Sequence, residues 1–435
     1  MEAFGNAKTV RNDNSSRFGK LVLLLLEKKT KKIKGAVITN YLLEKSRVIQ
    51  QSDSERNYHI FYHFLKGASK EDLKATGLTE MKNYEYLNKT KCYDVETIND
   101  VALYNEIQES FRVMKFHPNE IKAIWDMVAV VLHLGNINFD ESTFDGQNNK
   151  PCNITNQESF KKIIELLAVK EKSLEEALTH KTRKINSNVY KTPIPKIDCQ
   201  SIRLLLKIIF LNLLFKIKNR DSFTKSLYEK LFNYLIKRLN WSISTPEYRN
   251  IDIEQLISDK SRFSIGLLDI FGFEVFKKNS FEQLCINFAN EKLQQLYISY
   301  VFKAEINEFI KEGLKEFLCE LTFKDNQHII DLLEGAPLGI FNLLDESSAI
   351  ASTDESLLNN MIKQHKTNDN FKTPKGTREC FIIVHTAKEV EYNVTGFRTK
   401  NKDELGSELE KALKSSTSAI ISNIFNCILD DGEKN

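Results

Sequence analysis

Near its start the chain reads Asn12-Asp13-Asn14-Ser15-Ser16-Arg17-Phe18-Gly19, and much later it reads Asp269-Ile270-Phe271-Gly272-Phe273-Glu274. The first stretch, called the first loop below, offers hydroxyl groups for a metal ion and a phosphate, together with an arginine. The second stretch, called the second loop, offers an acid for the metal shell, a glycine amide for a phosphate oxygen and a glutamate for that arginine. In triphosphate hydrolases, two such loops close on the γ-phosphate and Mg²⁺ and open when the phosphate leaves. The two loops therefore predict a nucleotide switch.

The sequence contains no recognisable phosphate-binding loop to complete this switch. The usual form is G-x-x-x-x-G-K-[ST], whose backbone amides cradle the phosphates, and no stretch of the 435 residues has that pattern. The sequence therefore indicates that the chain comes from a nucleotide-switch protein, and it predicts that the nucleotide site within these residues is incomplete.

The composition limits the class of protein. Hydrophobic residues make up 41% and charged residues 28%, which predicts a globular protein with about two or three domains and an ample core. The net charge of +3, from 62 basic and 59 acidic residues, is too balanced to predict a nucleic-acid partner, so a charged partner would have to meet a local patch. Seven scattered cysteines without a C-x-x-C spacing predict free thiols in a reducing compartment and argue against zinc. The N-terminus has no secretory signal.

Apolar patterns predict a strand pair and several helices before the second loop. The apolar run over residues 18–26, the basic stretch Lys28 to Lys34 and the apolar residues 36–39 predict a β-hairpin with lysines at its turn. A strand that directly follows a phosphate-binding loop is expected in a central sheet. Helical periodicity occurs over much of residues 54–135 and again over 223–241.

A longer helix is predicted just after the second loop. Ser280 and Gln283 fit an S-x-x-Q capping box, and apolar spacing continues to about Glu312, which corresponds to roughly 50 Å at ~1.5 Å per residue. Because this helix begins so soon after Glu274, a small movement of the second loop would be carried a long way. Other patterns predict a helix over 355–365, strands at 381–385 and 390–394, and helical structure over 404–425.

Residues 203–219 do not match their surroundings. The stretch is dense in Leu, Ile and Phe, but a membrane span needs ~20 apolar residues with few charges, and Lys207, Asn212 and Lys216 exclude that interpretation. Its residue types are those written with A/T-rich codons. We therefore interpret it either as an intron that was translated as coding sequence in the gene model or as a lineage-specific insertion.

The chain resembles a myosin motor domain over nearly its full length. Kinesins share an N-x-x-S-S-R loop but carry a D-L-A-G-S-E type of second loop, whereas here D-I-F-G-F-E is followed at once by a capped helix that resembles the myosin relay helix. The strings that carry the resemblance are Glu2–Arg11, Tyr41–Val48, Glu55–Tyr62, His133–Ile137, Leu268–Glu274, Asn279–Gln295, Pro337–Glu346 and Val394–Phe397.

The resemblance implies an α/β fold, namely a mainly helical fragment of a P-loop-NTPase-type motor with a partial central β-sheet. Residues 1–260 would form the upper subdomain of an actin-binding cleft and hold the first loop. Residues 261–435 would hold the second loop, the relay helix, the lower subdomain and the return strand and helix. The family's phosphate loop, converter and lever arm would lie outside the chain, so the chain by itself is expected not to hydrolyse ATP.

The resemblance implies that the first loop binds ATP and Mg²⁺. Ser16 would bind Mg²⁺ directly, since this ion prefers hard oxygen ligands, and Asp269 would reach it through a water molecule. Ser15 would contact the γ-phosphate or relay a proton from the attacking water, while Asn12 and Asn14 would support the phosphates and the shape of the loop. Without the second loop, the same residues would be interpreted as an ordinary polar surface turn.

In the second loop, Gly272 would donate its backbone amide to the γ-phosphate, where a side chain would block approach. Closure would pair Arg17 with Glu274 in a bidentate ion pair that seals the site and positions the water. The alternative is that these are two ordinary surface charges.

The resemblance also predicts a surface for actin filaments, with light chains reached through a lever arm and a location on the cytoplasmic cytoskeleton. An apolar tip flanked by acids suits a partner with a hydrophobic groove and a basic rim, although an ordinary helical hairpin has the same pattern. A second contact is expected near residues 187–195. The residues assigned to the main contact are Leu343, Leu344, Asp345, Glu346, Ile350 and Ala351.

Two other interpretations stay open from the sequence. The chain could be a degenerate motor that binds actin without hydrolysis, or the product of a truncated gene with no independent function. His59 and His63 have the i, i+4 spacing of a metal pair, but no H-E-x-x-H glutamate lies between them, and the aromatic residues there favour packing.

Overall fold

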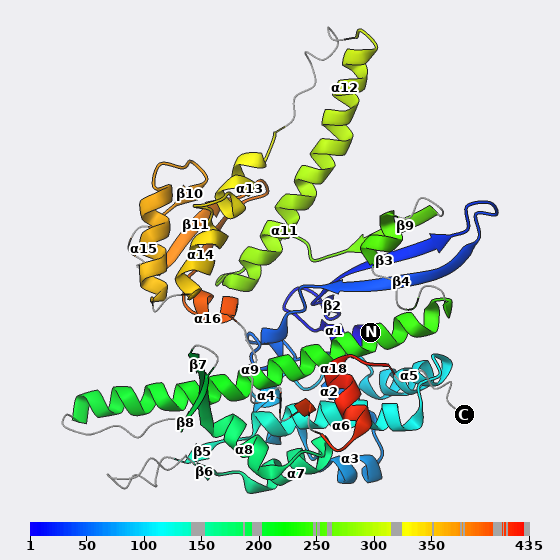
Figure 1. Cartoon of the computed structure of the whole chain (residues 1–435), viewed down its shortest axis with the longest axis vertical. Helices are drawn as coiled ribbons and strands as arrows, with labels where there is room; N and C mark the ends of the chain where they lie inside the picture. Colours follow the sequence, from blue (N-terminus) through cyan, green and yellow to red (C-terminus); the bar gives the residue numbers. More distant parts are fainter. Residues whose placement is uncertain are drawn as a thin grey trace. The chain divides into compact units, whose positions relative to one another are not determined.

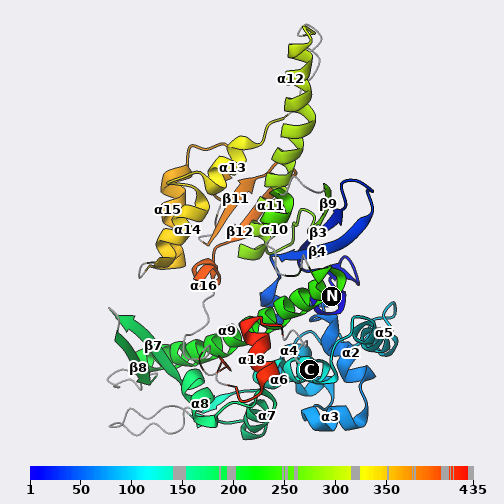
Figure 2. The same cartoon turned by 45° about the vertical axis from the view of Figure 1, so that its right-hand side comes forward.

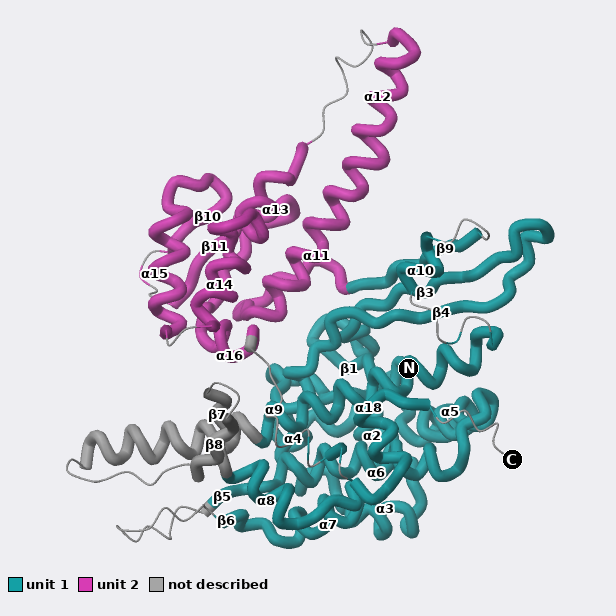
Figure 3. The backbone as a smooth tube through the Cα atoms, viewed as in Figure 1, with its two compact units in different colours: residues 1–270, 404–435 teal, residues 271–403 magenta. Residues whose placement is uncertain are grey.

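A computed structural model of the chain divides into two compact units (Figure 3). Unit 1 comprises residues 1–270 and 404–435, and unit 2 comprises residues 271–403. The chain therefore leaves unit 1 inside the second loop, between Ile270 and Phe271. This division differs from the predicted boundary at 260/261, and the assignment of the parts to the two sides of an actin-binding cleft stays a prediction.

The structure describes most of the chain. It covers residues 1–140, 153–185, 188–193, 202–246, 253–258, 263–314, 324–349, 352–374, 379–402 and 413–429 without 415, together with the single residues 249, 376 and 411, and for residues 140 and 180–219 it describes the backbone only.

Unit 1 is mostly helical, as its sequence predicts (Figure 1). Its main helices are α1 (Glu2–Gly5), α2 (His59–Gly67), α3 (Lys70–Thr76), α4 (Glu85–Asn88), α5 (Asp100–Val113), α6 (Pro118–Gly135), α7 (Gln157–Leu167), α8 (Glu171–Thr179), α9 (Ile202–Ile243), α10 (Ile253–Ser258) and α18 (Ala419–Asn426). Short 3-10 helices are η1 (Lys45–Val48) and η2 (Met81–Asn83), and short strand pairs are β1 (Asn6–Ala7) with β2 (Ser15–Ser16), β5 (Phe139–Asp140) with β6 (Asn153–Ile154), and β7 (His180–Ile185) with β8 (Asn188–Pro193).

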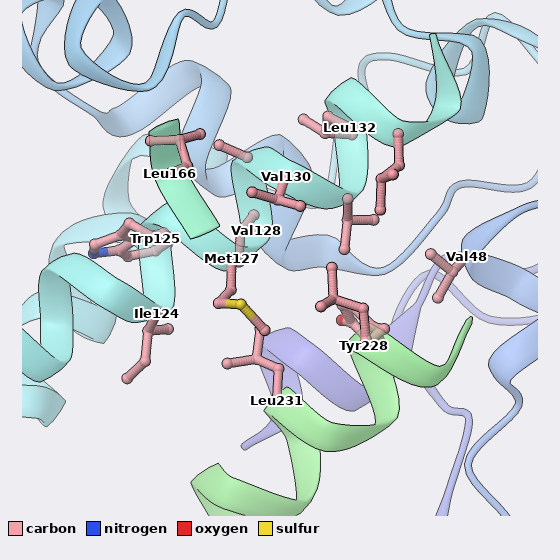
Figure 4. Close-up of a cluster of buried hydrophobic side chains, with 14 of the residues drawn as sticks. Val48, Ile124, Trp125, Met127, Val128, Val130, Leu132, Leu166, Tyr228 and Leu231 are labelled. Carbon is pink, nitrogen blue, oxygen red and sulfur yellow. The ribbon is translucent and has the colours of Figure 1, made fainter. Parts of the chain in front are cut away.

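The core of unit 1 is built around α6. Residues 123–135 of this helix are all buried, and apart from Asp126 and His133 they are apolar or glycine, as expected for a helix enclosed by others. Figure 4 shows part of this core, where side chains of α6 such as Met127 lie beside Leu231 of α9. The periodic helix predicted over 223–241 is confirmed and forms the second half of α9. Residues 203–219 fall in the first half of α9, outside the described side chains, and their origin stays a prediction.

A three-stranded sheet follows the first loop. The predicted hairpin is confirmed as β3 (Gly19–Leu26) and β4 (Ile33–Tyr41), and β9 (Phe263–Asp269) pairs antiparallel with β3 on its other side. The strand order is β4-β3-β9. All seven residues of β9 are exposed, and among the described residues no further strand pairs with it. β3 begins where the first loop ends, and β9 ends where the second loop begins, so the two loops are connected to neighbouring strands of this sheet.

The long helix predicted after the second loop is confirmed, with one irregularity. Ser280 and Gln283 form the predicted capping box. Three segments then follow without a break, namely α11 (Phe281–Tyr297), the π-helical segment η4 (Ile298–Lys303) and α12 (Ala304–Lys311), and Figure 2 shows them as one long rod. A π segment widens the helix by inserting an extra residue into a turn, a feature that often lies at functional sites.

The rest of unit 2 packs helices on a small antiparallel sheet. The strands are β10 (Phe371–Lys372), β11 (Cys380–Val384) and β12 (Glu389–Asn393), and the helices are α13 (Gln327–Glu334), α14 (Ile340–Ala349), α15 (Asp354–His365) and α16 (Phe397–Lys402). The predicted helix over 355–365 and both predicted strands are confirmed. Most of residues 404–418 lie outside the described part of the chain, and of the helical pattern predicted over 404–425 the structure shows residues 411, 413 and 414 and the helix α18.

No helix among the described residues has the length and the apolar character needed to cross a bilayer.

Candidate functional site

The first loop is shaped by its own asparagines. β1 pairs with β2, so that Asn6 lies opposite Ser16. The Asn6 Nδ2 donates to Asn14 Oδ1 at 3.1 Å, and the backbone amide of Asn14 donates to Asn12 Oδ1 at 2.9 Å. These bonds form the turn from which β2, with both serines, emerges. Ser15 and Ser16 are half-buried.

A buried chain of charges holds Arg17 at the end of this loop. Its Nε donates to Glu44 Oε2 at 2.7 Å, and Arg47 Nε donates to the same oxygen at 2.7 Å. Arg47 Nη1 donates in turn to Glu55 Oε2 at 2.9 Å, and the Val10 amide donates to Glu55 Oε1 at 3.2 Å. The four charged side chains are at most 12% exposed. The chain of charges therefore joins Arg17 to the segment that leads into the first loop.

Glu44 is ionised at the centre of this chain. Burial alone would raise the pKa of Glu44, but the charges and hydrogen bonds of Arg47 and Arg17 outweigh burial and lower the pKa to about 2. Arg17 Nη1 also donates to Ser15 Oγ at 3.3 Å. Because Glu44 takes Nε, a second carboxylate would reach Arg17 through its terminal nitrogens.

Asp269 belongs to the same unit as the first loop, although it opens the second. It ends β9, and the antiparallel register places it opposite Lys20, at the start of β3. Lys20 Nζ lies 3.2 Å from Asp269 Oδ2, and the aspartate side chain is 58% exposed. Because β3 follows directly on the first loop, the structure brings this acid to the end of that loop and leaves it accessible to water.

From Phe271 onward, the second loop is tied to α11 in unit 2. The Glu274 amide donates to Asn287 Oδ1, and Asn287 Nδ2 donates to the Glu274 carbonyl, both at 2.8 Å. Asn290 Nδ2 donates to the Phe271 carbonyl at 3.1 Å, and Gln283 Nε2 donates to Glu274 Oε2 at 3.3 Å. Loop and helix are thus joined by side-chain amides that bind the loop's backbone.

The contacts of Asn287 extend into a buried hydrogen-bond network. Asn287 Nδ2 also donates to Tyr392 Oη at 2.9 Å, and Tyr392 Oη lies 2.8 Å from His385 Nε2. His385 Nδ1 lies 3.2 Å from Glu291 Oε1, and Asn326 Nδ2 donates to the Glu291 backbone carbonyl at 2.9 Å. Each donor finds an acceptor if His385 donates from Nδ1 to Glu291 and accepts through Nε2 from the tyrosine hydroxyl. The network connects the second loop to β12 and to the start of α13.

The packing around residue 272 does not explain why this residue is a glycine. A Cβ atom added there would meet no heavy atom within 4 Å. The space beside its Cα is therefore open, which fits a position that a ligand approaches.

The residues present fit a magnesium nucleotide better than a metal held by protein alone. Among the described residues, no group of three His, Cys, Asp or Glu side chains could hold a metal ion. The available oxygen donors are the hydroxyls of Ser15 and Ser16 and the carboxylate of Asp269. Such a set matches Mg²⁺, which usually keeps water ligands and takes one or two protein oxygens together with phosphates.

Arg17 belongs to unit 1 and Glu274 to unit 2, and the pair between them stays a prediction. Glu274 is 8% exposed. Sequence reasoning missed Glu44, although Glu44 and Arg47 stand within the string Tyr41–Val48. It also missed Asn287, although residues 283, 287 and 290 form a polar stripe at helical spacing.

The segment predicted to contact actin is partly buried. Leu343 and Leu344, on α14, are 2% and 0% exposed and belong to the core of unit 2. The prediction that these two leucines contact actin directly is therefore wrong, because their side chains are buried in the core that holds α14 on the sheet. Asp345 and Glu346 are exposed, with Asn401 Nδ2 donating to Asp345 Oδ1 at 2.7 Å. Ile350 and Ala351 lie outside the described residues, as do the side chains near residues 187–195.

The histidine pair of α2 is a packed pair in unit 1. The rings of His59 and His63 stack with centroids 5.6 Å apart, and His63 Nδ1 lies 2.9 Å from Asp100 Oδ1. Burial, with the charges of His63 and Arg56, lowers the pKa of His59 to about 3, so its ring is neutral at ordinary pH.

Comparison with known proteins gives one consistent result. The family model described as myosin head (motor domain) matches residues 1–434. A myosin-I heavy chain of Dictyostelium discoideum is 38% identical over 434 residues, which cover 100% of this chain and 17% of that protein. Myosin-6 of Arabidopsis thaliana is 39% identical over 435 residues (100% and 27%), and unconventional myosin-VIIb of Mus musculus is 36% identical over 428 residues (98% and 19%). The chain thus spans at most 27% of the length of these three relatives.

Replacing Glu44 by Gln is expected to destabilise the protein by about 3–5 kcal/mol, because two buried arginines lose the carboxylate that balances them. Denaturant unfolding at neutral pH measures the loss. Glu109→Gln is the matched control, since it removes an exposed partner of Arg112, and it should leave the stability nearly unchanged because solvent screens exposed ion pairs. Similar small effects of both substitutions would contradict the assigned role of Glu44.

The stability that Glu44 provides is expected to disappear in acid. Because the pKa of Glu44 falls from 4.5 to about 2 on folding, its contribution is complete above about pH 4.5 and is lost as the pH falls toward 2. The difference in unfolding free energy between wild type and Glu44→Gln should therefore shrink over this range. Glu291, whose pKa is also lowered to about 2, is present in both proteins and cancels in the difference. A constant difference down to pH 2 would exclude this linkage.

Asn287→Ala is expected to release the backbone of the second loop. The Glu274 amide loses its buried acceptor, so its hydrogen exchange should accelerate by roughly tenfold or more, as expected for a net hydrogen-bond contribution of ~1.5 kcal/mol. Exchange measured by mass spectrometry over residues 271–280 gives the rate. Asn290→Ala is the control, because it removes the contacts to the Phe271 and Ile286 carbonyls and leaves the acceptor of the Glu274 amide in place. Equal exchange of the Glu274 amide in both variants would contradict the assignment to Asn287.

Proposed function

The chain belongs to the myosin head (motor domain) family, and on that premise we propose that it is part of an actin-based motor that couples ATP hydrolysis to movement along actin filaments. The observation that carries the proposal is the presence of both nucleotide-sensing loops, each fixed by its own buried contacts. The relatives share the whole of this chain, but the chain spans a minor part of them, so the activity is that of the intact protein.

In this proposal, the loops hold a magnesium nucleotide whose phosphate cradle comes from a segment outside these 435 residues. Ser16 would give a hydroxyl oxygen to Mg²⁺, and Asp269 would hold one of its water ligands. The nucleotide supplies the bond that is cleaved. Ser15, which accepts from Arg17 at 3.3 Å, would orient its own hydroxyl hydrogen toward the γ-phosphate or the attacking water. Gly272, with open space at its Cα, would bring its amide to the γ-phosphate.

Arg17 would be shared between two carboxylates. Glu44 holds Nε permanently, and Glu274 would join through the terminal nitrogens when the second loop closes. This arrangement keeps the guanidinium oriented while the loop is open, so closure loses little entropy in ordering Arg17. The closed pair would exclude bulk water and position the attacking one.

A displacement of the second loop would be transmitted through α11. Its backbone is bonded to Asn287 and Asn290 of that helix, and the rod continues through η4 to Lys311. A tilt at its first turn is enlarged along its length, which gives a physical route from phosphate contact to a distant mechanical element.

The actin contact proposed here rests on the exposed acids of α14 and on the residues that follow this helix in sequence. Asp345 and Glu346 are the exposed members, and the apolar contact would come from Ile350 and Ala351. Association with actin filaments would place the protein on the cytoskeleton in the cytoplasm, and light chains would bind a lever arm outside this chain.

A second candidate is an actin-binding protein without hydrolysis. The lack of a G-x-x-x-x-G-K-[ST] pattern in the 435 residues favours it for the chain by itself. Saturable sedimentation with actin filaments, unchanged by ATP, would support this candidate.

The test uses the full-length protein that contains this chain. Its ATPase should be stimulated by actin filaments, and Arg17→Ala should lower hydrolysis at least 100-fold, since one ion pair of about 3–5 kcal/mol is lost. The double exchange Arg17→Glu with Glu274→Arg should recover only part of the activity, because the carboxylate introduced at position 17 would then face Glu44.

Arg112→Ala is the matched control, since Arg112 is an exposed arginine of the same unit, and it should leave the rate unchanged. Full activity of Arg17→Ala would refute the role of Arg17. Actin binding without any ATPase in the unmodified protein would replace the proposed function by the second candidate.

A further inference from the structure

The turn between β3 and β4 carries charge that the proposed motor function does not use. Residues 27–34, called the lysine turn here, read Glu-Lys-Lys-Thr-Lys-Lys-Ile-Lys. Five lysines minus one glutamate give a charge of +4 in one turn. The whole chain has a net charge of +3, so all its other residues together sum to −1. The lysine turn is therefore a local patch of the kind that a charged partner requires.

The lysine turn is closed by its own backbone and is exposed. The Lys31 amide donates to the Glu27 carbonyl at 2.8 Å, and the Glu27 amide donates to the Lys32 carbonyl at 3.0 Å. All five lysines are exposed. Figure 1 shows the turn as the dark blue loop at the end of the sheet of unit 1. The fold thus presents the five ammonium groups together.

Two contacts within unit 1 involve lysines of this turn. Glu27 Oε1 lies 3.8 Å from Lys34 Nζ, and Lys31 Nζ lies 3.4 Å from the centre of the Phe263 ring. Five ammonium groups in one turn repel one another, because they carry like charges at short distances. An anionic surface would relieve that repulsion.

An apolar row lies beside the lysines at the same end of the sheet. The register places Leu26 of β3 opposite Ile33 of β4 and opposite Phe263 of β9. Ile33 is 63% exposed and Phe263 is 43% exposed. Residues directly opposite one another on neighbouring strands share a face of the sheet. Lysines around exposed apolar side chains match the boundary between lipid headgroups and acyl chains.

The composition of the turn favours a lipid surface over a nucleic acid. Arginine is the residue that recognises single phosphates with bidentate bonds, whereas lysine acts as a point charge, and the turn contains no arginine. The apolar row also has no use against a phosphate backbone. We propose that the lysine turn, with Ile33 and Phe263, binds the surface of membranes that contain anionic phospholipids.

Vesicle sedimentation of the full-length protein tests this proposal. Phosphatidylcholine vesicles with phosphatidylserine should bind the protein, and phosphatidylcholine alone should not. The triple variant Lys28→Gln, Lys31→Gln, Lys32→Gln should weaken binding by roughly 100-fold at low salt, at about fivefold for each lysine. Ile33→Ser should weaken binding also at high salt, where charge attraction is screened.

The control is Lys161→Gln, Lys170→Gln, Lys172→Gln, which removes the same charge from exposed positions of unit 1 away from the turn. It should bind vesicles like the unmodified protein, and thermal unfolding should be the same for all variants. Equal losses in both triple variants, or binding to phosphatidylcholine alone, would overturn the proposal. Loss of sedimentation with RNA or actin filaments in the turn variant, without vesicle binding by the unmodified protein, would assign the patch to that partner instead. Neither result depends on ATP hydrolysis, so the motor function is tested separately.

Discussion

A single buried carboxylate, that of Glu44, orders the first loop. Two arginines donate to the same oxygen of this side chain, and Tyr58 Oη donates to its backbone carbonyl at 2.9 Å. A buried arginine without a carboxylate would be costly, so neither Arg17 nor Arg47 can leave without penalty to the other. The geometry of the nucleotide site proposed in unit 1 therefore rests on residues that never touch a nucleotide.

The second loop is held by a different kind of chemistry. Its contacts to α11 come from neutral side-chain amides, and Tyr392 and His385 continue them into the core of unit 2. Bonds of this type depend on distance and angle, and they respond weakly to salt. The first loop is thus sensitive to charge, such as that of a phosphate, whereas the second is sensitive to position. A switch needs both properties, one to detect the ligand and one to convert detection into displacement.

Local patterns predicted much of this structure, and long-range pairs limited the prediction. The capping box of Ser280, the hairpin with its basic turn and the helices over 223–241 and 355–365 follow from spacing within a few residues. Nothing local indicates that Arg17 meets Glu44, because that pair depends on how η1 packs against the loop. Leu343 and Leu344 show the opposite error. Family resemblance placed them at a partner surface, while their apolar character, which signals burial, was the better guide.

The pairing of β9 with β3 has a consequence for how the protein is made. β3 and β4 are joined by one short turn and can form a hairpin as soon as they leave the ribosome, since local contacts close quickly. The partner on the other side of β3 is synthesised only after all the helices from α2 to α10. During that interval β9 is not yet present to take up the N–H and C=O groups along this edge of β3, and unpaired strand edges pair readily with other chains. This edge of β3 therefore reaches its native pairing only when residues 263–269 have been made.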